Sequence, residues 1–242
     1  MAQLEVPFEV LVVDNNSTDN TARIAADYTG IRLLQETTQG RVFARNTGFN
    51  AANGDILARI DADAVLPADW TRQIGAYFEQ PGAMETSWTG AAFFYNVRFP
   101  HIVSAIYNAL VFRFNRFLAG HPTLWGSNMA LPKKLWQEVK DDICLRNDVH
   151  EDLDLAIHLH RHGRRIHYTR RVKTHVQLRR VRSNHRELWD YLQMWPRTLR
   201  IHGLKTWPIC WVLGDVLLYA LSPLFSISER VARLLGRKPL ED

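Results

Sequence analysis

Short apolar runs alternate with helical patterns along the first quarter of the chain. The runs Phe8–Val13, Ile31–Leu34 and Ile56–Ile60 predict three strands. Between them, Ala22–Tyr28 and Arg41–Ala52 have the spacing and the flanking turn residues of helices. Strands that alternate with helices predict an α/β fold with a mainly parallel central sheet covered by helices on both faces.

From residue 67 onward the pattern predicts further elements but is less regular. They are a helix from Pro67 to Phe78, a strand region Thr86–Val97, a helical segment His101–Leu118, a loop and short strand Leu124–Leu131, a helix opened by Leu131-Pro132-Lys133, a helix Glu151–His162, a strand Arg165–Gln177, and helical character from Glu187 onward. We therefore expect residues 1–186 to form one α/β domain and residues 187–242 to form a helical appendage.

Composition adds two expectations. With 242 residues and 46% hydrophobic content, the chain can bury a substantial core. The two cysteines, Cys144 and Cys210, have no zinc-type spacing, so we expect buried thiols in a reducing compartment. The N-terminus shows no secretory pattern, which predicts a cytoplasmic protein.

Positive charge is concentrated late in the chain. The net charge is +5, and lysines and arginines crowd the stretch from Arg161 to Lys205. Anionic lipid, nucleic acid or a diphosphate substrate would each suit such a surface, and so would plain solvation. The apolar segment Thr206–Ser226 is interrupted by Asp215 and two prolines, which favours a helix lying on the membrane surface over a span. Packing against the domain and a dimer contact remain alternatives.

Asp61 and Asp63 directly follow the third predicted strand. Ligands of open α/β folds bind at the carboxyl ends of their strands. Two carboxylates at this spacing can share a hard divalent cation such as Mg²⁺ or Mn²⁺, which also accepts phosphate oxygens. Exposed carboxylates at a strand end are the alternative when this motif is taken alone.

Four further motifs accompany this pair in a fixed order. They are Val12-Val13-Asp14-Asn15-Asn16-Ser17-Thr18-Asp19, Gly40-Arg41 through Ala44-Arg45-Asn46-Thr47-Gly48, Gly126-Ser127-Asn128-Met129-Ala130, and Glu151-Asp152-Leu153-Asp154-Leu155. In order and spacing the set resembles family 2 glycosyltransferases, over roughly residues 8–185. The resemblance implies a GT-A fold that binds a nucleotide-sugar with Mn²⁺ or Mg²⁺.

The resemblance also implies roles for individual residues on the donor side. Asp14 and Asn15 would contact the nucleotide, with Arg41 or Arg45 nearby. Asp63 would be the chief metal ligand, with Asp61 supporting it from the ribose side. His175 lies on the strand after the Glu151–His162 helix, where related enzymes place a third metal ligand, and a purely structural histidine is the alternative.

On the acceptor side, Asp152 matches the family's general base, with Glu151 beside it. A helix N-terminus favours the ionised form of such a carboxylate, although these acidic residues could simply complement the helix dipole. Gly126, Ser127 and Asn128 would form a tight turn near the acceptor, and a surface turn is the alternative.

The histidines at positions 158, 160 and 162 alternate along one predicted helix and therefore cannot all face one metal ion. We expect solvated or stacked imidazoles there.

The resemblance implies an inverting transferase that moves a sugar from a nucleoside diphosphate donor to a hydroxyl, which we expect to belong to a glycan or lipid-linked acceptor. We expect it at the inner face of the cell membrane, for cell-envelope or surface glycan synthesis, without a nucleic-acid partner. Family members usually begin with an additional strand and helix before the segment that starts here at Phe8, so we expect a chain shortened relative to the family. A nucleotidyltransferase and a non-catalytic nucleotide-sugar-binding or membrane-docking scaffold remain alternatives.

Overall fold

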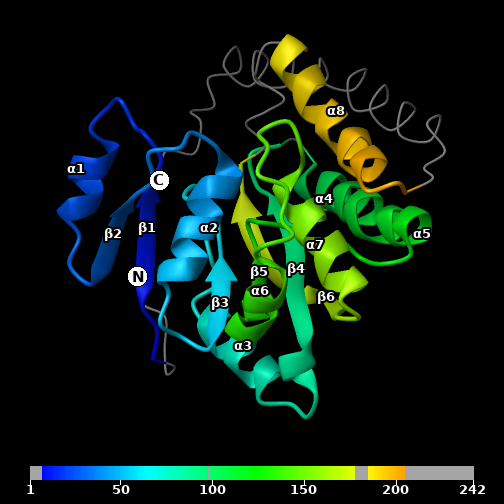
Figure 1. Ribbon diagram of the computed structural model, residues 1–242, viewed down its shortest axis with the longest axis horizontal. Coiled ribbons are helices and arrows are strands. Elements are labelled where there is room, and N and C mark those ends of the chain that lie inside the picture. The colour runs from blue at the N-terminus through cyan, green and yellow to red at the C-terminus, as the bar shows by residue number, and fades with distance from the viewer. Residues whose placement is uncertain (1–6, 98, 178–184, 205–242) are drawn as a thin grey trace.

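The computed structural model describes residues 7–97, 99–177 and 185–204. Its strands are β1 (Val10–Asp14), β2 (Ile31–Gln35), β3 (Ile56–Arg59), β4 (Thr86–Phe94), β5 (Met129–Pro132) and β6 (Arg165–Val176). Its helices are α1 (Thr21–Ala26), α2 (Arg41–Ala51), α3 (Trp70–Phe78), η1 (Ala83–Glu85), α4 (Pro100–Asn108), the π-helix η2 (Ala109–Phe114), α5 (Asn115–Ala119), α6 (Lys133–Val139), α7 (Glu151–Arg161) and α8 (His185–Ile201). In Figure 1, strands alternate with flanking helices in this order, which confirms the predicted α/β class.

The strands form a parallel pair, β1–β2, and a four-stranded sheet in the order β3-β5-β4-β6. Three strands of this sheet, β3, β4 and β6, run in the same direction, which agrees with the predicted mainly parallel sheet, and β5 runs antiparallel to its neighbours β3 and β4. The first residue of β5, Met129, lies opposite Arg59, the last residue of β3. The turn before β5 is therefore placed beside the residues that follow β3.

Alternation along β5 divides the core between the two faces of this sheet. Met129 and Leu131 pack with apolar residues of α2, α6 and α7, whereas Ala130 between them packs with α3. All three side chains are fully buried. This period of two is the pattern expected for a strand buried on both faces, and it fixes the register of β5 against β3.

Helix α8 lies across α7 at the edge of the domain (Figure 1). Leu199 of α8 is fully buried against Leu153 and Ile157 of α7, with Trp195 and Leu204 at the margin of this contact. The described part of the predicted appendage thus packs on the α/β domain. The boundary between residues 186 and 187 stays a prediction, and the apolar segment Thr206–Ser226 lies outside the described residues. Within the described residues, no helix combines the length and apolar character that crossing a membrane requires.

Candidate functional site

An arginine that the sequence analysis did not single out lies at the centre of the candidate site. Arg59 ends β3, and its guanidinium contacts three carboxylates. Its Nη1 lies 2.6 Å from Oδ1 of Asp152, and its Nη2 lies 3.3 Å from both Oδ1 of Asp61 and Oε1 of Glu151. We call these four residues the Arg59 cluster. They join the end of β3 to the first turn of α7, more than 90 positions later in the chain.

The second oxygen of Asp152 is held by the turn before β5. The backbone N–H of Gly126 donates to Asp152 Oδ2 over 2.7 Å. A Cβ atom on Gly126 would lie 2.6 Å from Cζ of Arg59 and 2.8 Å from this Asp152 oxygen, which is far inside normal contact distance. Glycine is therefore required because the backbone passes so close to the arginine–carboxylate pair.

The two neighbouring carboxylates of α7 differ in their pKa. Burial raises the pKa of Glu151, but Arg59 and Arg41 outweigh burial and leave that pKa well below its usual range. Burial also raises the pKa of Asp152; Arg59 opposes this only in part, because the charges of Glu151 and Asp61 act in the same direction as burial. A carboxylate with a raised pKa is the better proton acceptor, so this difference favours Asp152 over Glu151 as a base.

The predicted metal-binding side chains follow β3. Ser127 Oγ donates to Oδ2 of Asp61, whose side chain is 45% exposed. Two residues beyond Asp63, Val65 forms a two-hydrogen-bond bridge with His175: the Val65 N–H donates to the His175 carbonyl over 2.8 Å, and the reverse bond measures 2.9 Å. The backbone bridge thus attaches the loop that carries Asp61 and Asp63 to β6 at His175. The His175 ring lies tilted against Phe93, with 4.9 Å between the ring centroids.

The predicted nucleotide side is built at the end of β1 and the start of α2. Asp14 is buried, and among the described residues its Oδ1 has no hydrogen-bond partner. The side chain of Asn15 is used within the protein, since it bonds the carbonyls of Glu36 and Thr38 and the N–H of Gly40. Asn15 therefore shapes the loop before α2, and a direct contact of its side chain with the nucleotide stays a prediction.

The two arginines of α2 have different environments. Arg45 is buried, and its Nη1 donates to the Glu151 carbonyl over 2.8 Å. Burial lowers its pKa to about 10, so it remains charged at neutral pH. Arg41 is 37% exposed at its side chain and lies 3.7 Å from Glu151, at the rim of the Arg59 cluster. Of the two, Arg41 is the one accessible to a ligand.

Asn128 is enclosed within the sheet. Its Oδ1 accepts a hydrogen bond from Trp70 Nε1 over 2.9 Å, and its Nδ2 donates to the carbonyl of Val172 over 3.2 Å. Its own carbonyl accepts from Gly90 and Thr89. The structure therefore gives Asn128 a role in holding the turn before β5, and acceptor contact by this residue stays a prediction.

A signal for Arg59 exists in the sequence. It is the one charged residue in the apolar strand Ile56–Ile60, and it stands two positions before Asp61 on the same side of the strand. A buried arginine requires carboxylate partners, because an unpaired charge in the interior is strongly unfavourable. That argument predicts acidic residues around Arg59 but does not say which part of the chain supplies them.

The side chains at the end of β3 fit a divalent metal ion. Asp61 and Asp63 offer carboxylate oxygens, the ligands that Mg²⁺ and Mn²⁺ prefer, and the half-exposed Asp61 leaves room for ligands from solvent or substrate. Arg59, Arg41 and Arg45 already place positive charge around the buried carboxylates behind them. A cation here would therefore add charge to the exposed edge of the site, where a diphosphate could meet it.

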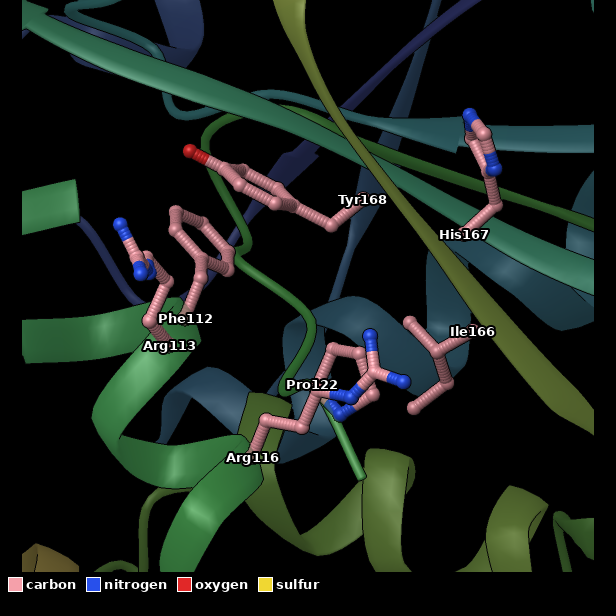
Figure 2. A pocket seen from close by; sticks show the side chains of 7 residues that line it. All are labelled: Phe112, Arg113, Arg116, Pro122, Ile166, His167 and Tyr168. Atoms are coloured by element: carbon pink, nitrogen blue, oxygen red, sulfur yellow. The ribbon is translucent and has the colours of Figure 1, made fainter. Parts of the chain in front are cut away.

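A separate cavity of about 230 Å³ lies between η2, α5, Pro122 and β6. Figure 2 shows Phe112 and Tyr168 stacked face to face at one end with Arg113 beside Phe112, and Arg116 beside Pro122 at the other. None of its lining residues belongs to the Arg59 cluster or to the predicted donor and acceptor sites. This cavity is therefore separate from the site that the sequence predicts.

Comparisons with known proteins concern the family and the fold. The family model described as glycosyl transferase family 2 matches residues 2–130. Glycosyltransferase AglE of Haloferax volcanii is 40% identical over 68 residues, covering 26% of this chain, and an undecaprenyl-phosphate 4-deoxy-4-formamido-L-arabinose transferase of Serratia proteamaculans is 36% identical over 73 residues, covering 28%. Each match spans only 22% of the relative's own length.

Among solved structures, the mannosyltransferase PcManGT of Pyrobaculum calidifontis, in complex with GDP-Man and Mn²⁺, superposes with a TM-score of 0.55 at 21% identity. The match covers 96% of this chain and 67% of that one. A likeness at this level of identity concerns the fold, and it confirms the expected GT-A architecture.

Proposed function

The chain belongs to glycosyl transferase family 2, and from that premise we propose that it transfers a sugar from a nucleoside diphosphate donor to a hydroxyl acceptor, with inversion at the anomeric carbon. One observation carries the proposal: Asp61 at the end of β3 and Asp152 at the start of α7 meet on Arg59, beside the turn formed by Gly126 and Ser127. A strand-end carboxylate for the donor and a helix-start carboxylate for the acceptor thus lie in one site.

Asp152 is the proposed general base. Its carboxylate accepts the proton of the acceptor hydroxyl while the hydroxyl oxygen attacks the anomeric carbon, and the bond from that carbon to the diphosphate breaks with the electron pair leaving on the diphosphate. Arg59 and the Gly126 N–H fix the orientation of Asp152 through one oxygen each. Both are positioning groups, since neither reacts with the sugar.

The lowered pKa of Glu151 suits a different role. A carboxylate that stays ionised at all ordinary pH values keeps Arg59 and Arg41 in place but is a poor proton acceptor. Glu151 therefore supports the site, while Asp152 reacts.

On the donor side, Asp61 and Asp63 would hold the divalent cation, with His175 as the proposed third ligand. When bound, Mn²⁺ or Mg²⁺ supplies positive charge that stabilises the departing diphosphate. The buried Asp14 oxygen without a partner would accept a hydrogen bond from the base or ribose, and Arg41 at the rim would approach the nucleotide.

The acceptor is proposed to be a glycan or a lipid-linked molecule at the inner face of the cell membrane. The name of the Serratia proteamaculans relative contains a polyprenyl phosphate, and the basic residues between Arg161 and Lys205 suit an anionic surface. The role in cell-envelope or surface glycan synthesis rests on the same support.

The test is a comparison of metal-dependent donor binding with turnover. Wild type and Asp63→Ala are titrated with UDP and GDP in Mn²⁺ by calorimetry, and then assayed with nucleotide-sugar panels for release of nucleoside diphosphate. We expect Asp63→Ala to lose both binding and release, while a matched change at the exposed Asp142 leaves both unchanged. Normal turnover by Asp63→Ala would refute the proposal. Metal-dependent binding without release by wild type on any donor would favour the scaffold instead.

A further inference from the structure

Four potential metal ligands meet one turn beyond the Arg59 cluster on α7. They are Cys144 in the loop before α7, Asp154 and His158 on α7 itself, and His202 just after α8. One donor atom from each lies within 4.8 Å of every other. We call these residues the Cys144 cluster. Asp154 and His158 are four positions apart and so share one side of the helix.

The separations between donor atoms approach those around a tetrahedral ion. Nε2 of His202 lies 2.7 Å from Oδ1 of Asp154 and 3.9 Å from Sγ of Cys144, and Nε2 of His158 lies 3.6 Å from the same Asp154 oxygen. Around tetrahedral zinc, with bonds near 2.0 Å to nitrogen or oxygen and 2.3 Å to sulfur, ligand atoms are about 3.3 to 3.5 Å apart. Shifts below about 1 Å in side chains therefore suffice to enclose the ion.

The members of the cluster are more deeply buried than hydrogen bonds between them alone would explain. Asp154 is fully buried, and the side chain of His202 is 4% exposed. Within the described part of the chain, Nε2 of His158 is a buried nitrogen without a hydrogen-bond partner. A buried polar atom that lacks a partner is uncommon in folded proteins and calls for an explanation, of which an ion is one. This nitrogen faces the Asp154 carboxylate at 3.6 Å.

We infer that Cys144, Asp154, His158 and His202 form a structural zinc site. The ligand types decide the ion: thiolate and imidazole select zinc over Mg²⁺, Mn²⁺ and Ca²⁺, which prefer oxygen. A thiolate and a carboxylate also balance the two positive charges of Zn²⁺, so the buried site carries no net charge. On binding, the Cys144 thiol loses its proton to solvent, and the other three ligands keep their ordinary charge.

The site has a consequence for its surroundings. With zinc on Nε2, the Nδ1 atom of His202 carries the proton, so Arg161 gives up its present contact with Nδ1 at 3.1 Å. It retains the hydrogen bond from Nη2 to the His202 carbonyl at 2.6 Å. Three separate parts of the chain, the loop before α7, α7 and the end of α8, are then held by one ion. Zinc would fix α8 on the helix that carries Asp152, and it would take no part in sugar transfer.

Metal content and a cobalt spectrum test this inference without any activity assay. The full chain is produced with zinc in the medium, freed of any metal-binding tag, and its zinc is measured by mass spectrometry. The metal-free protein is then titrated with Co²⁺. We expect about one zinc per chain, and with cobalt the intense thiolate charge-transfer and tetrahedral d–d bands that oxygen-only sites lack. A wild-type chain that stays folded, holds no zinc and shows no charge-transfer band with Co²⁺ would overturn the inference.

Variants separate this site from the proposed one at Asp61 and Asp63. Cys144→Ser and His158→Gln should each weaken zinc binding by at least about 100-fold, and Cys144→Ser should remove the charge-transfer band. His160→Gln is the matched control, because this exposed histidine of the same helix stacks on His121 outside the cluster. Asp63→Ala should keep its zinc. A charge-transfer band that persists in Cys144→Ser, or an equal loss of zinc in His160→Gln, would contradict the assignment.

Discussion

The Arg59 cluster and the Cys144 cluster lie about one helical turn apart on α7, and each contains a buried carboxylate from this helix. In the first, Glu151 and Asp152 face a permanent cation from β3, and the guanidinium is shared among three acids. In the second, Asp154 faces imidazoles and a thiol, none of which carries a fixed positive charge. Arg59 alone does not offset the three acids of the first cluster, but Arg41 and Arg45 beside Glu151 bring the number of nearby positive charges to three. The Cys144 cluster contains no permanent cation among its four members, so within it only a protonated histidine or an ion could offset Asp154.

This difference bears on what each cluster can do. Arg59 is shared among three acids, so Asp152 keeps a raised pKa and can still accept a proton. Side chains that all point at one metal ion are no longer available for chemistry, which suits a structural role. Helix α7 can thus carry the proposed base, Asp152, on one turn and the proposed structural metal ligands on the next.

The largest effect should come from removing the base. Asp152→Asn keeps the size of the side chain but cannot accept a proton, so turnover should fall by about 10² to 10⁴-fold. Donor affinity and zinc content should stay at wild-type values, which would separate the two clusters. Initial rates at saturating donor are the measurement, with Asp142→Asn as control. A turnover rate within about threefold of wild type would be too small a loss for a general base and would exclude Asp152 from that role.

The second largest effect should come from removing Arg59, the cation that the three carboxylates share. Arg59→Met removes the cation that Glu151, Asp152 and Asp61 share, and breaking a buried ion pair on one side costs about 3 to 5 kcal/mol. Urea unfolding measures the change in the free energy of unfolding. Arg72→Met is the control, because its pair with Asp69 is exposed and contributes about 1 kcal/mol or less. Equal losses in both variants would show that the Arg59 cluster is not a buried ionic centre.

A smaller effect should follow from crowding the turn before β5. The methyl group of Gly126→Ala would lie 2.6 Å from Arg59, so the guanidinium or Asp152 must shift. Displacement of a reacting group by about 1 Å can lower turnover by about 10²-fold. Gly54→Ala, whose nearest atom would be 3.6 Å away, serves as the control in the same kinetic assay. Unchanged turnover in Gly126→Ala would mean that the rate does not depend on the exact position of Asp152.

The smallest effect on stability should come from the rim of the Arg59 cluster. Arg41→Gln removes a partly exposed charge that lies 3.7 Å from Glu151, and such pairs contribute less than about 1 kcal/mol. If Arg41 approaches the nucleotide, calorimetry should nevertheless show weaker binding of UDP or GDP. Unchanged nucleotide affinity would leave Arg41 with no role beyond this weak pair.

Much of the fold follows from local patterns in the sequence. The strand Ile31–Gln35 and the helices starting at Arg41 and Glu151 form where apolar spacing and turn residues predict them. The direction of β5 could not be predicted in this way, since an apolar run shows that a strand exists but not which neighbour it pairs with. That direction depends on the turn at Gly126, which places Met129 opposite Arg59.

The candidate site was likewise predictable where it depends on local pattern and not where it depends on contacts between distant parts of the chain. Asp61 and Asp152 could be proposed because each begins or ends an element with a readable boundary. Arg59 required knowledge of which acids surround it, and Cys144 could not be paired with His202 because 58 positions separate them until α8 packs on α7. The alternation of the histidines at positions 158, 160 and 162 shows only that they cannot all face one ion, and it does not show that His158 lies near residues of other elements.

The arginine at the end of β3 also affects the order in which the molecule can assemble. Because the counter-charge for Glu151 and Asp152 is part of the chain, the first turn of α7 can dock on the sheet without an ion from solution. Chelators added during purification should then strip any cation from the exposed Asp61 and leave the buried acids in place. The donor pocket would thus be built first and loaded afterwards.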